Sequence, residues 1–171
     1  MIQIYCGTGK GKTTAALGLT MRAAGAGMRV LFVQFLKGGE TSELASLARL
    51  PEVTVRRCDR NYGFIPRMRE MERVGCTACH NRLLAGVAEA MQQHTADLIV
   101  LDELFAAYNA DLLDRVAAEK LVQACPPEIE LVMTGREPAA CFTDAADYIS
   151  EIQAVRHPFE KGIYARKGIE Y

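Results

Sequence analysis

The chain has 171 residues, of which 50% are hydrophobic and 24% are charged, and its formal net charge is -1. A chain of this length and composition can bury a core of its own, so we expect one folded domain over residues 1–171 and exclude intrinsic disorder. The even balance of charge argues against nucleic acid and anionic membranes as partners, because both are bound by basic surfaces.

The N-terminus runs directly into a short apolar segment. It carries no basic region followed by an apolar core, which would mark a secretory signal, and no apolar run in the chain reaches the length of a membrane span. We therefore expect a cytoplasmic protein. The six cysteines are scattered between positions 6 and 141, unlike the dense pattern of small secreted folds, and this scatter predicts free thiols.

Apolar runs alternate with helical patterns through the first part of the chain. Residues 2–6 are typical of a buried strand, and residues 13–26 carry small apolar side chains at helical spacing. Residues 29–35 are apolar enough for a strand that is covered on both faces. We then expect a short helix, a strand and a surface loop, over residues 43–50, 53–55 and 58–66.

The second part of the chain repeats this alternation. Residues 68–94 place apolar side chains at helical spacing, which predicts a long helix with one buried face. Residues 97–103 are typical of a buried strand that ends in two acids. We then expect a helix, two strands and a charged tail, over residues 112–124, 128–134, 148–152 and 153–171. Such alternation predicts an α/β fold with a mainly parallel sheet and helices on both faces.

A glycine- and lysine-rich turn joins the first strand to the first helix. Its backbone amides can converge on phosphate oxygens because glycines leave the approach open, and the helix that follows offers its positive end. Cys6 stands where the usual pattern has its first glycine. The turn nevertheless predicts a P-loop that binds the triphosphate of ATP, in a single-domain P-loop NTPase fold of the RecA-like type. The predicted loop residues are Gly7, Thr8, Gly9, Lys10, Gly11, Lys12, Thr13 and Thr14.

Acidic and polar residues end two of the predicted strands. Ligands of open α/β sheets bind at the carboxyl ends of the strands, so Asp102 and Glu103 are expected beside the loop, as are Gln34 and Lys37. We expect Lys12 to reach the terminal phosphate oxygens, and Mg²⁺ to be bound by Thr13 with Asp102 or Glu103.

A phosphate loop by itself does not identify the reaction, and other segments of the chain restrict the choice of reaction. Several segments of the chain form a pattern when they are read together. They are the motif Gly-Thr-Gly-Lys-Gly-Lys-Thr-Thr-Ala-Ala of residues 7–16, segments 33–38, 101–104, 134–136 and 146–151, and the endings at 155–162 and 165–171. Together they resemble the ATP:corrinoid adenosyltransferases of cobalamin biosynthesis. The resemblance covers nearly the whole chain, and the tail carries most of it. The loop of that family also lacks the glycine that Cys6 replaces.

The resemblance implies that a Co(I) corrinoid attacks the 5′ carbon of ATP and expels triphosphate. Lys12 and Lys10 would then stabilise the charge that grows on the leaving group, and Glu103 would act near the metal rather than as a general base. Arg136 and His157 are candidate nucleotide ligands on the same ground. Each of them is equally well explained as a solvated surface charge.

The corrinoid itself needs an apolar cover, and residues 62–66 are the candidate. In the family a Phe and a Trp press on the lower face of the corrin ring. Phe64 is the candidate for the Phe, but Pro66 lies near the Trp position and the chain contains no Trp. The resemblance further implies a flavoprotein reductant that supplies Co(I), and a homodimer. Because the chain begins at its first strand, the N-terminal cap found in some members is expected to be absent.

Cys76, Cys79 and His80 have the spacing of a haem attachment site. Haem attachment requires export, and one Cys-x-x-Cys with one His is an incomplete zinc set, so chance placement in the helix is favoured.

Two other classes of P-loop protein are alternatives. A thymidine-kinase-like nucleoside kinase would be expected to carry paired Cys-x-x-Cys motifs near its end, and a regulatory or DNA-acting ATPase would need basic patches or further domains. Neither alternative explains the tail.

Overall fold

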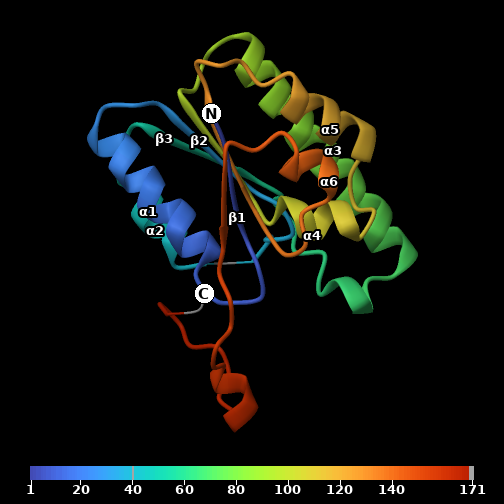
Figure 1. Cartoon of the computed structure of the whole chain (residues 1–171). Helices are drawn as coiled ribbons and strands as arrows, with labels where there is room; N and C mark the ends of the chain where they lie inside the picture. Colours follow the sequence, from blue (N-terminus) through green and yellow to red (C-terminus); the bar gives the residue numbers. More distant parts are fainter. Residues whose placement is uncertain (40, 170–171) are drawn as a thin grey trace.

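A parallel β-sheet forms the centre of the molecule (Figure 1). The computed structural model describes residues 1–39 and 41–169, so the last two residues of the tail motif, Glu170 and Tyr171, lie outside the described part. Within it the strand order is β3-β2-β4-β5-β1-β6, and every neighbouring pair is parallel. The strands are β1 (Ile2–Cys6), β2 (Val30–Gln34), β3 (Val53–Arg57), β4 (Leu98–Asp102), β5 (Glu130–Thr134) and β6 (Tyr148–Glu151).

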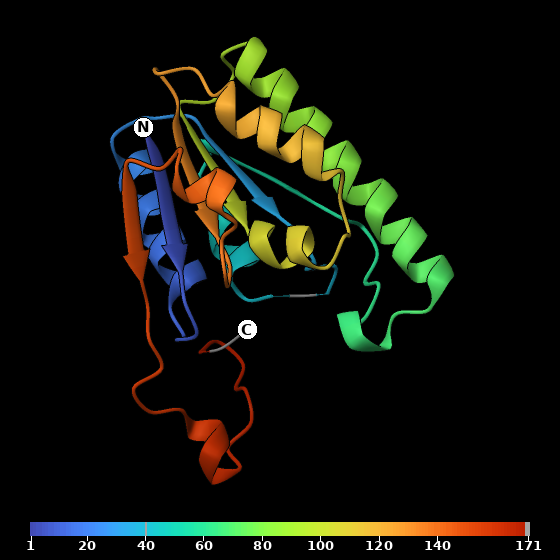
Figure 2. The ribbon, with the colours of Figure 1, turned by 45° about the vertical axis from the view of Figure 1, so that its right-hand side comes forward.

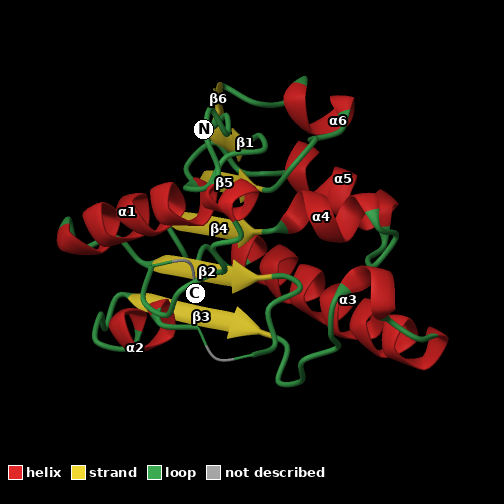
Figure 3. Ribbon diagram, turned by 90° about the horizontal axis from the view of Figure 1, so that it is seen from below, coloured by secondary structure: helices red, strands yellow, loops and turns green. Residues whose placement is uncertain are grey.

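Helices cover both faces of this sheet (Figure 3). One face carries α1 (Lys12–Gly25) and α2 (Glu43–Leu47), and the other carries α3 (Glu70–Gln92), α4 (Leu104–Asn109), α5 (Arg115–Gln123) and α6 (Ala140–Thr143). Two short 3₁₀ turns, η1 (Ile65–Arg67) and η2 (Pro158–Lys161), lie in connecting segments. The predicted α/β fold is confirmed. In the described part of the chain, none of the helices has the length and apolar character needed to cross a bilayer.

The central strands are buried along their whole length. All five residues of β2 and all five of β4 are buried, as their apolar sequences predict. Successive strand side chains point to opposite faces, so Leu98 and Val100 pack in one cluster with Ala16 of α1, whereas Ile99 and Leu101 pack in the other. All the strands run toward one edge of the sheet, and the loops that follow them meet there (Figure 2).

The structure contains two short helices that the sequence patterns did not indicate, α4 and α6. Four residues of α4 are buried, so its sequence shows no polar face from which a helical period could be recognised. The predicted helix over residues 112–124 begins later, at Arg115, because the side chain of Asp114 accepts a hydrogen bond from the amide of Ala117 and caps the first turn.

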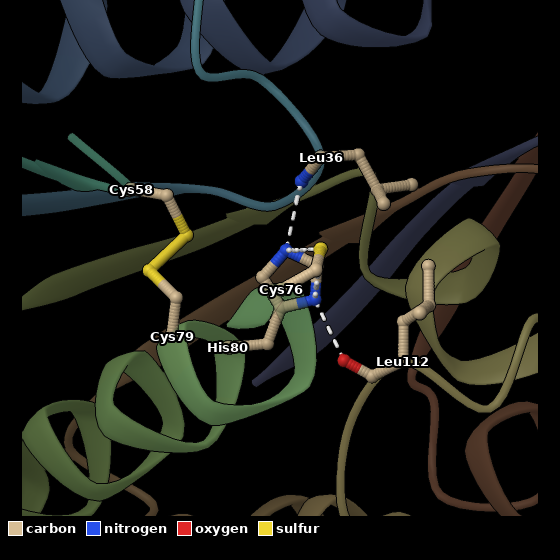
Figure 4. The surroundings of a disulfide bond; sticks show 6 residues. All are labelled: Leu36, Cys58, Cys76, Cys79, His80 and Leu112. Carbon is tan, nitrogen blue, oxygen red and sulfur yellow. Dashed lines mark hydrogen bonds between the residues drawn. A yellow bond between two sulfur atoms is a disulfide. The ribbon is translucent and has the colours of Figure 1, made fainter. Parts of the chain in front are cut away.

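The expectation of free thiols is wrong for two cysteines. Cys58, just after β3, forms a disulfide with Cys79 of α3 (Figure 4). Their Cα atoms lie 6.1 Å apart, within the range that a disulfide spans. The two residues are separated by 21 positions in the sequence, and only the packing of α3 beside the end of β3 brings them together. Cys6, Cys76, Cys125 and Cys141 are free.

We expect Cys58→Ser to lower the free energy of unfolding by roughly 3 kcal/mol, because the bond restricts the unfolded chain over a loop of this length. Urea unfolding without reductant measures the loss, with Cys125→Ser, a change at a free thiol, as the control. In the presence of reductant the wild type should fall to the level of Cys58→Ser. Equal stability of the two proteins without reductant would contradict the disulfide.

Candidate nucleotide site

The turn between β1 and α1 closes around the side chain of Lys12. The Nζ atom of Lys12 donates hydrogen bonds to the backbone oxygens of Gly7 and Gly9, at 2.9 and 2.8 Å. Gly7 and Gly11 have φ angles of 103° and 126°, which residues other than glycine rarely adopt. Lys12 is only 8% exposed, and this burial lowers its pKa. The loop therefore holds a cationic group at the centre of a ring of backbone atoms.

The segment that follows β6 crosses this loop at close range. The amide of Gly9 donates to the oxygen of Ile152 at 2.7 Å, and the amide of Ile152 donates to the oxygen of Cys6 at 2.8 Å. A Cβ atom added to Gly7 would lie 2.5 Å from the Ile152 oxygen, and one added to Gly9 would lie 2.8 Å from the backbone of Gln153. These glycines are thus required by the chain's own tail, a constraint that the phosphate-loop pattern does not reveal.

The carboxylate of Asp102, at the end of β4, is the centre of a polar cluster. Its Oδ1 atom accepts hydrogen bonds from the hydroxyls of Thr13 (2.9 Å) and Thr134 (2.8 Å). Its Oδ2 atom pairs with Nζ of Lys37 at 2.9 Å. Asp102 has no exposed surface. Burial opposes the charge of Lys37, but the carboxylate beside it outweighs this effect and raises the pKa of Lys37.

A second polar pair lies beside this cluster. Gln34, which is opposite Asp102 in the β2–β4 register, donates through Nε2 to the carboxylate of Glu43 at 3.0 Å. Glu43 also lies 3.5 Å from Nζ of Lys37. The Oε1 atom of Gln34 is buried and has no hydrogen-bond partner among residues 1–39 and 41–169. An unpaired buried acceptor next to a polar cluster is a position where a donor from a bound molecule would be stabilised.

Glu103 follows Asp102 in a left-handed backbone conformation, with a φ angle of 60°. Its amide donates to the hydroxyl of Thr134 at 2.9 Å, so this one hydroxyl bridges both acidic residues. Burial and the neighbouring Asp102 raise the pKa of Glu103, while Lys37, Lys12 and Arg136 oppose that rise. The half-buried carboxylate therefore lies within the electrostatic reach of three cations.

The oxygen donors at this edge suit Mg²⁺, which takes only some of its ligands from the protein, better than they suit a metal whose ligands all come from the protein. Mg²⁺ commonly takes one or two protein oxygens and completes its shell with phosphate oxygens and water. The hydroxyl of Thr13 and the carboxylate of Asp102 are adjacent oxygen donors of that kind. In residues 1–39 and 41–169 no group of three His, Cys, Asp or Glu side chains is arranged to hold a metal. A cation here would depend on a bound nucleotide for its other ligands.

Two cavities adjoin the phosphate loop. One of about 430 Å³ is lined by Lys10, Thr13, Thr14, Lys37 and Glu43, and by Gly168 and Ile169 of the tail. The other, of about 350 Å³, lies between Lys10 and the tail segment that includes His157. Thr8 is exposed, and its hydroxyl accepts from the amide of Ala154. The structure therefore brings the tail, which carries the candidate His157, to the loop.

Two other candidates differ in their placement. Arg136 is exposed after β5, and its charge lowers the pKa of Lys12, which puts it in electrostatic contact with the loop. Phe64 is 76% exposed and precedes η1, which lies on the α3 side of the same sheet edge, across from the phosphate loop (Figure 2). The loop that carries Phe64 thus lies at the same edge of the sheet as the phosphate loop, but on the α3 side (Figure 2).

Sequence reasoning missed three contributors to this site: Thr134, Glu43 and the backbone of Ile152. Thr134 belongs to the motif Thr-Gly-Arg that the sequence analysis identified, but the motif did not show that its hydroxyl faces Asp102. Glu43 starts α2 and has no local signal that links it to Gln34. The closeness of Ile152 to the loop follows from the pairing of β6 with β1, which is a long-range contact.

Comparison with known proteins matches the chain to one family over its whole length. The sequence model of the family described as ATP:corrinoid adenosyltransferase BtuR/CobO/CobP matches residues 1–171. A corrinoid adenosyltransferase from Pseudomonas aeruginosa is 36% identical over 174 residues, covering 100% of this chain and 83% of that protein. The corrinoid adenosyltransferase CobA of Salmonella typhimurium is 32% identical over 171 residues, covering 100% and 85%.

Among solved structures, a KaiC-like protein from Pyrococcus horikoshii is similar in fold. The TM-score is 0.55 at 15% identity, over 89% of this chain and 71% of that one. At this identity the likeness supports the RecA-like α/β fold and nothing about the reaction. Neither a nucleoside kinase nor a regulatory ATPase is favoured by the sequence matches.

We expect Thr134→Val to lower the free energy of unfolding by about 2 kcal/mol, because it removes one donor to the buried Asp102 and leaves the amide of Glu103 unpaired. Thr134→Ser, the matched control, keeps the hydroxyl and loses a methyl group, which costs about 1 kcal/mol. Both values are measured by urea unfolding. A smaller loss in the Val variant than in the Ser variant would show that the hydroxyl does not bridge the two acids.

Proposed function

The chain belongs to the ATP:corrinoid adenosyltransferase family, and we propose that its phosphate loop and the Asp102 cluster hold the triphosphate of ATP as a leaving group. It is an enzyme that transfers the 5′-deoxyadenosyl group of ATP to a corrinoid. The observation that carries the proposal is the convergence of Lys12, Lys37 and the Thr13–Asp102 pair at one sheet edge, in a chain that matches the family over its whole length.

In the reaction the electron pair of Co(I) attacks the 5′ carbon of ATP. The cobalt–carbon bond forms, cobalt becomes formally Co(III), and the bond between the 5′ carbon and its oxygen breaks. The electrons of that bond leave with triphosphate, so negative charge grows on the departing oxygen. The nucleophile needs no deprotonation, and the protein's task is to bind, orient and stabilise charge.

Lys12 is the residue that we assign to charge stabilisation, with Lys10 and Arg136 in support. In the structure Nζ of Lys12 donates to two loop carbonyls, which keeps the ammonium group desolvated and oriented. Phosphate oxygens are stronger acceptors than carbonyls and would take over these donors. Exposed Lys10 lines both cavities beside the loop and can follow the outer phosphates. His157, from the tail side of the second cavity, is proposed as a further nucleotide ligand.

We propose that Mg²⁺ binds with the nucleotide, held by Thr13 with Asp102 and approached by Glu103. When bound, the cation would neutralise charge on the triphosphate. The carboxylate of Asp102 is held in place by its pairing with Lys37 and by hydrogen bonds from two hydroxyls, so it can serve as a fixed oxygen ligand at the sheet edge. Gln34 contributes an acceptor, Oε1, that has no partner within the described residues.

The corrinoid is proposed to lie against the loop that carries Phe64. A flat ligand of this size needs an apolar surface, and Phe64 offers one at 76% exposure. Pro66 stands near the position where the family has a Trp, and the sequence contains no Trp, so the lower face of the ring would be contacted differently here.

Three further parts of the proposal rest on the sequence and its family resemblance, and not on the geometry of the site. A flavoprotein reductant would supply the electron that produces Co(I), the enzyme would work in the cytoplasm, and it would form a homodimer. Gel filtration coupled to light scattering tests the last point directly.

The function is tested by mixing the protein with ATP, Mg²⁺ and cobalamin under a strong chemical reductant. We expect the corrinoid spectrum to change to that of the adenosylated form, with inorganic triphosphate released in equal amount. Release of ADP or orthophosphate without a change in the corrinoid spectrum would refute the transferase assignment.

Lys12→Ala should lower the rate of transfer by about 10²- to 10³-fold, because the charge on the leaving oxygen loses its buried cationic partner. Lys120→Ala, on the exposed surface of α5, is the matched control and should keep the wild-type rate. Circular dichroism establishes that both variants are folded. A Lys12→Ala variant with wild-type rates would remove Lys12 from the mechanism.

A further inference from the structure

His80 is fully buried on α3 and is bonded through both ring nitrogens (Figure 4). Its Nδ1 atom lies 2.8 Å from the backbone oxygen of Leu112. Its Nε2 atom lies 3.1 Å from the amide nitrogen of Leu36, which is a donor. The ring also packs edge-on against Phe35, with 5.3 Å between the ring centres. The ring therefore joins the loop after β2 to the turn before α5.

These partners allow only one form of the ring. A carbonyl oxygen accepts, so Nδ1 must carry a proton, and an amide donates, so Nε2 must present a lone pair. The neutral ring protonated on Nδ1 satisfies both partners at once. Burial favours the same form, since it lowers the pKa of His80. His80 is thus a fixed bridge that has no free nitrogen for a metal or for haem.

His80 accepts its hydrogen bond from the amide of Leu36, a residue with a strained backbone. Leu36 has a φ angle of 61°, a left-handed conformation that costs a non-glycine residue about 1–2 kcal/mol. Such a conformation persists when surrounding contacts hold it. The hydrogen bond to His80 fixes the peptide between Phe35 and Leu36, and the amide of Phe35 also donates a hydrogen bond to the backbone oxygen of Asp102.

The next residue in this turn is Lys37, whose Nζ pairs with the buried carboxylate of Asp102 at 2.9 Å. Its direction depends on the left-handed turn at Leu36. The loop continues into Gly38, where an added Cβ atom would lie 2.1 Å from the oxygen of Arg60, so it presses against the segment after β3. That segment is tied by the disulfide to Cys79, the neighbour of His80. The turn is therefore fixed to α3 from two sides.

We propose that His80 is a positioning residue for the nucleotide site. Through the amide of Leu36 it holds the turn in which Lys37 is directed at Asp102, and it touches neither substrate. Loss of its acceptor would free the peptide, relax the turn at Leu36 and weaken the Lys37–Asp102 pair beside the proposed Mg²⁺ and triphosphate. The inference rests on the proposed role of Lys37 and Asp102 in binding the nucleotide.

Two substitutions at one position separate the two bonds of His80. The amide nitrogen of an asparagine can replace Nδ1, so His80→Asn keeps the donor to Leu112 and loses the acceptor for Leu36. The amide oxygen of a glutamine can replace Nε2, so His80→Gln keeps the acceptor for Leu36 and loses the donor to Leu112. Each variant therefore lacks one buried hydrogen bond, and a purely structural role would affect both alike.

Mg·ATP binding to each variant is measured by titration calorimetry without corrinoid. We expect His80→Asn to bind roughly fivefold to tenfold more weakly than the wild type, as the loss of one positioning hydrogen bond implies, and His80→Gln to stay within about twofold. In the transfer assay the KM for ATP should rise in His80→Asn while the KM for the corrinoid is unchanged. Equal binding by the two variants would overturn the proposal.

Lys37→Ala completes the test. If His80 acts through Lys37, adding His80→Asn to Lys37→Ala should weaken Mg·ATP binding no further, whereas additive losses would overturn the inference. Wild-type Mg·ATP binding by Lys37→Ala would overturn it even if His80→Asn does not fold, and would also reject the proposed role of Lys37. Weak binding by Lys37→Ala together with normal binding by His80→Asn would reject the positioning role alone. Failure of adenosyl transfer with intact Mg·ATP binding would count only against the proposed function.

Discussion

A carboxylate without contact to solvent must be surrounded by donors, and in this protein that carboxylate is Asp102. Three elements supply its partners: Thr13 from the start of α1, Thr134 from the end of β5 and Lys37 from the loop after β2. Each partner also belongs to the proposed nucleotide site. The need to compensate one buried charge thus arranges the phosphate loop, the turn after β2 and the acidic end of β4 around a common point.

The same arrangement suits the chemistry that we propose. A reaction whose nucleophile is Co(I) needs no base, and the protein has to bind a highly charged leaving group without paying for its desolvation at the moment of reaction. Lys12 is already desolvated and held by the carbonyls of Gly7 and Gly9, so its orientation is set before the nucleotide arrives. Preorganised cations of this kind are most effective where water is excluded.

The tail has a larger structural role than its charged sequence indicates. The residue that precedes it, Ile152, bonds directly to the phosphate loop, and residues of the tail itself line both cavities beside Lys10. The tail was also the part of the sequence that best identified the family.

The sequence by itself determined the fold class, the phosphate loop and the acidic strand end, because these are local patterns: apolar runs of strand length, glycines before a helix, and acids after Leu101. It also identified the family through several motifs read together. Only the tertiary structure decided which hydroxyl faces Asp102, that Ile152 crosses the loop, that Cys58 meets Cys79, and that His80 bonds the amide of Leu36. Each of these contacts joins residues from separate elements, and their distances depend on how the helices pack on the sheet, which no local pattern records.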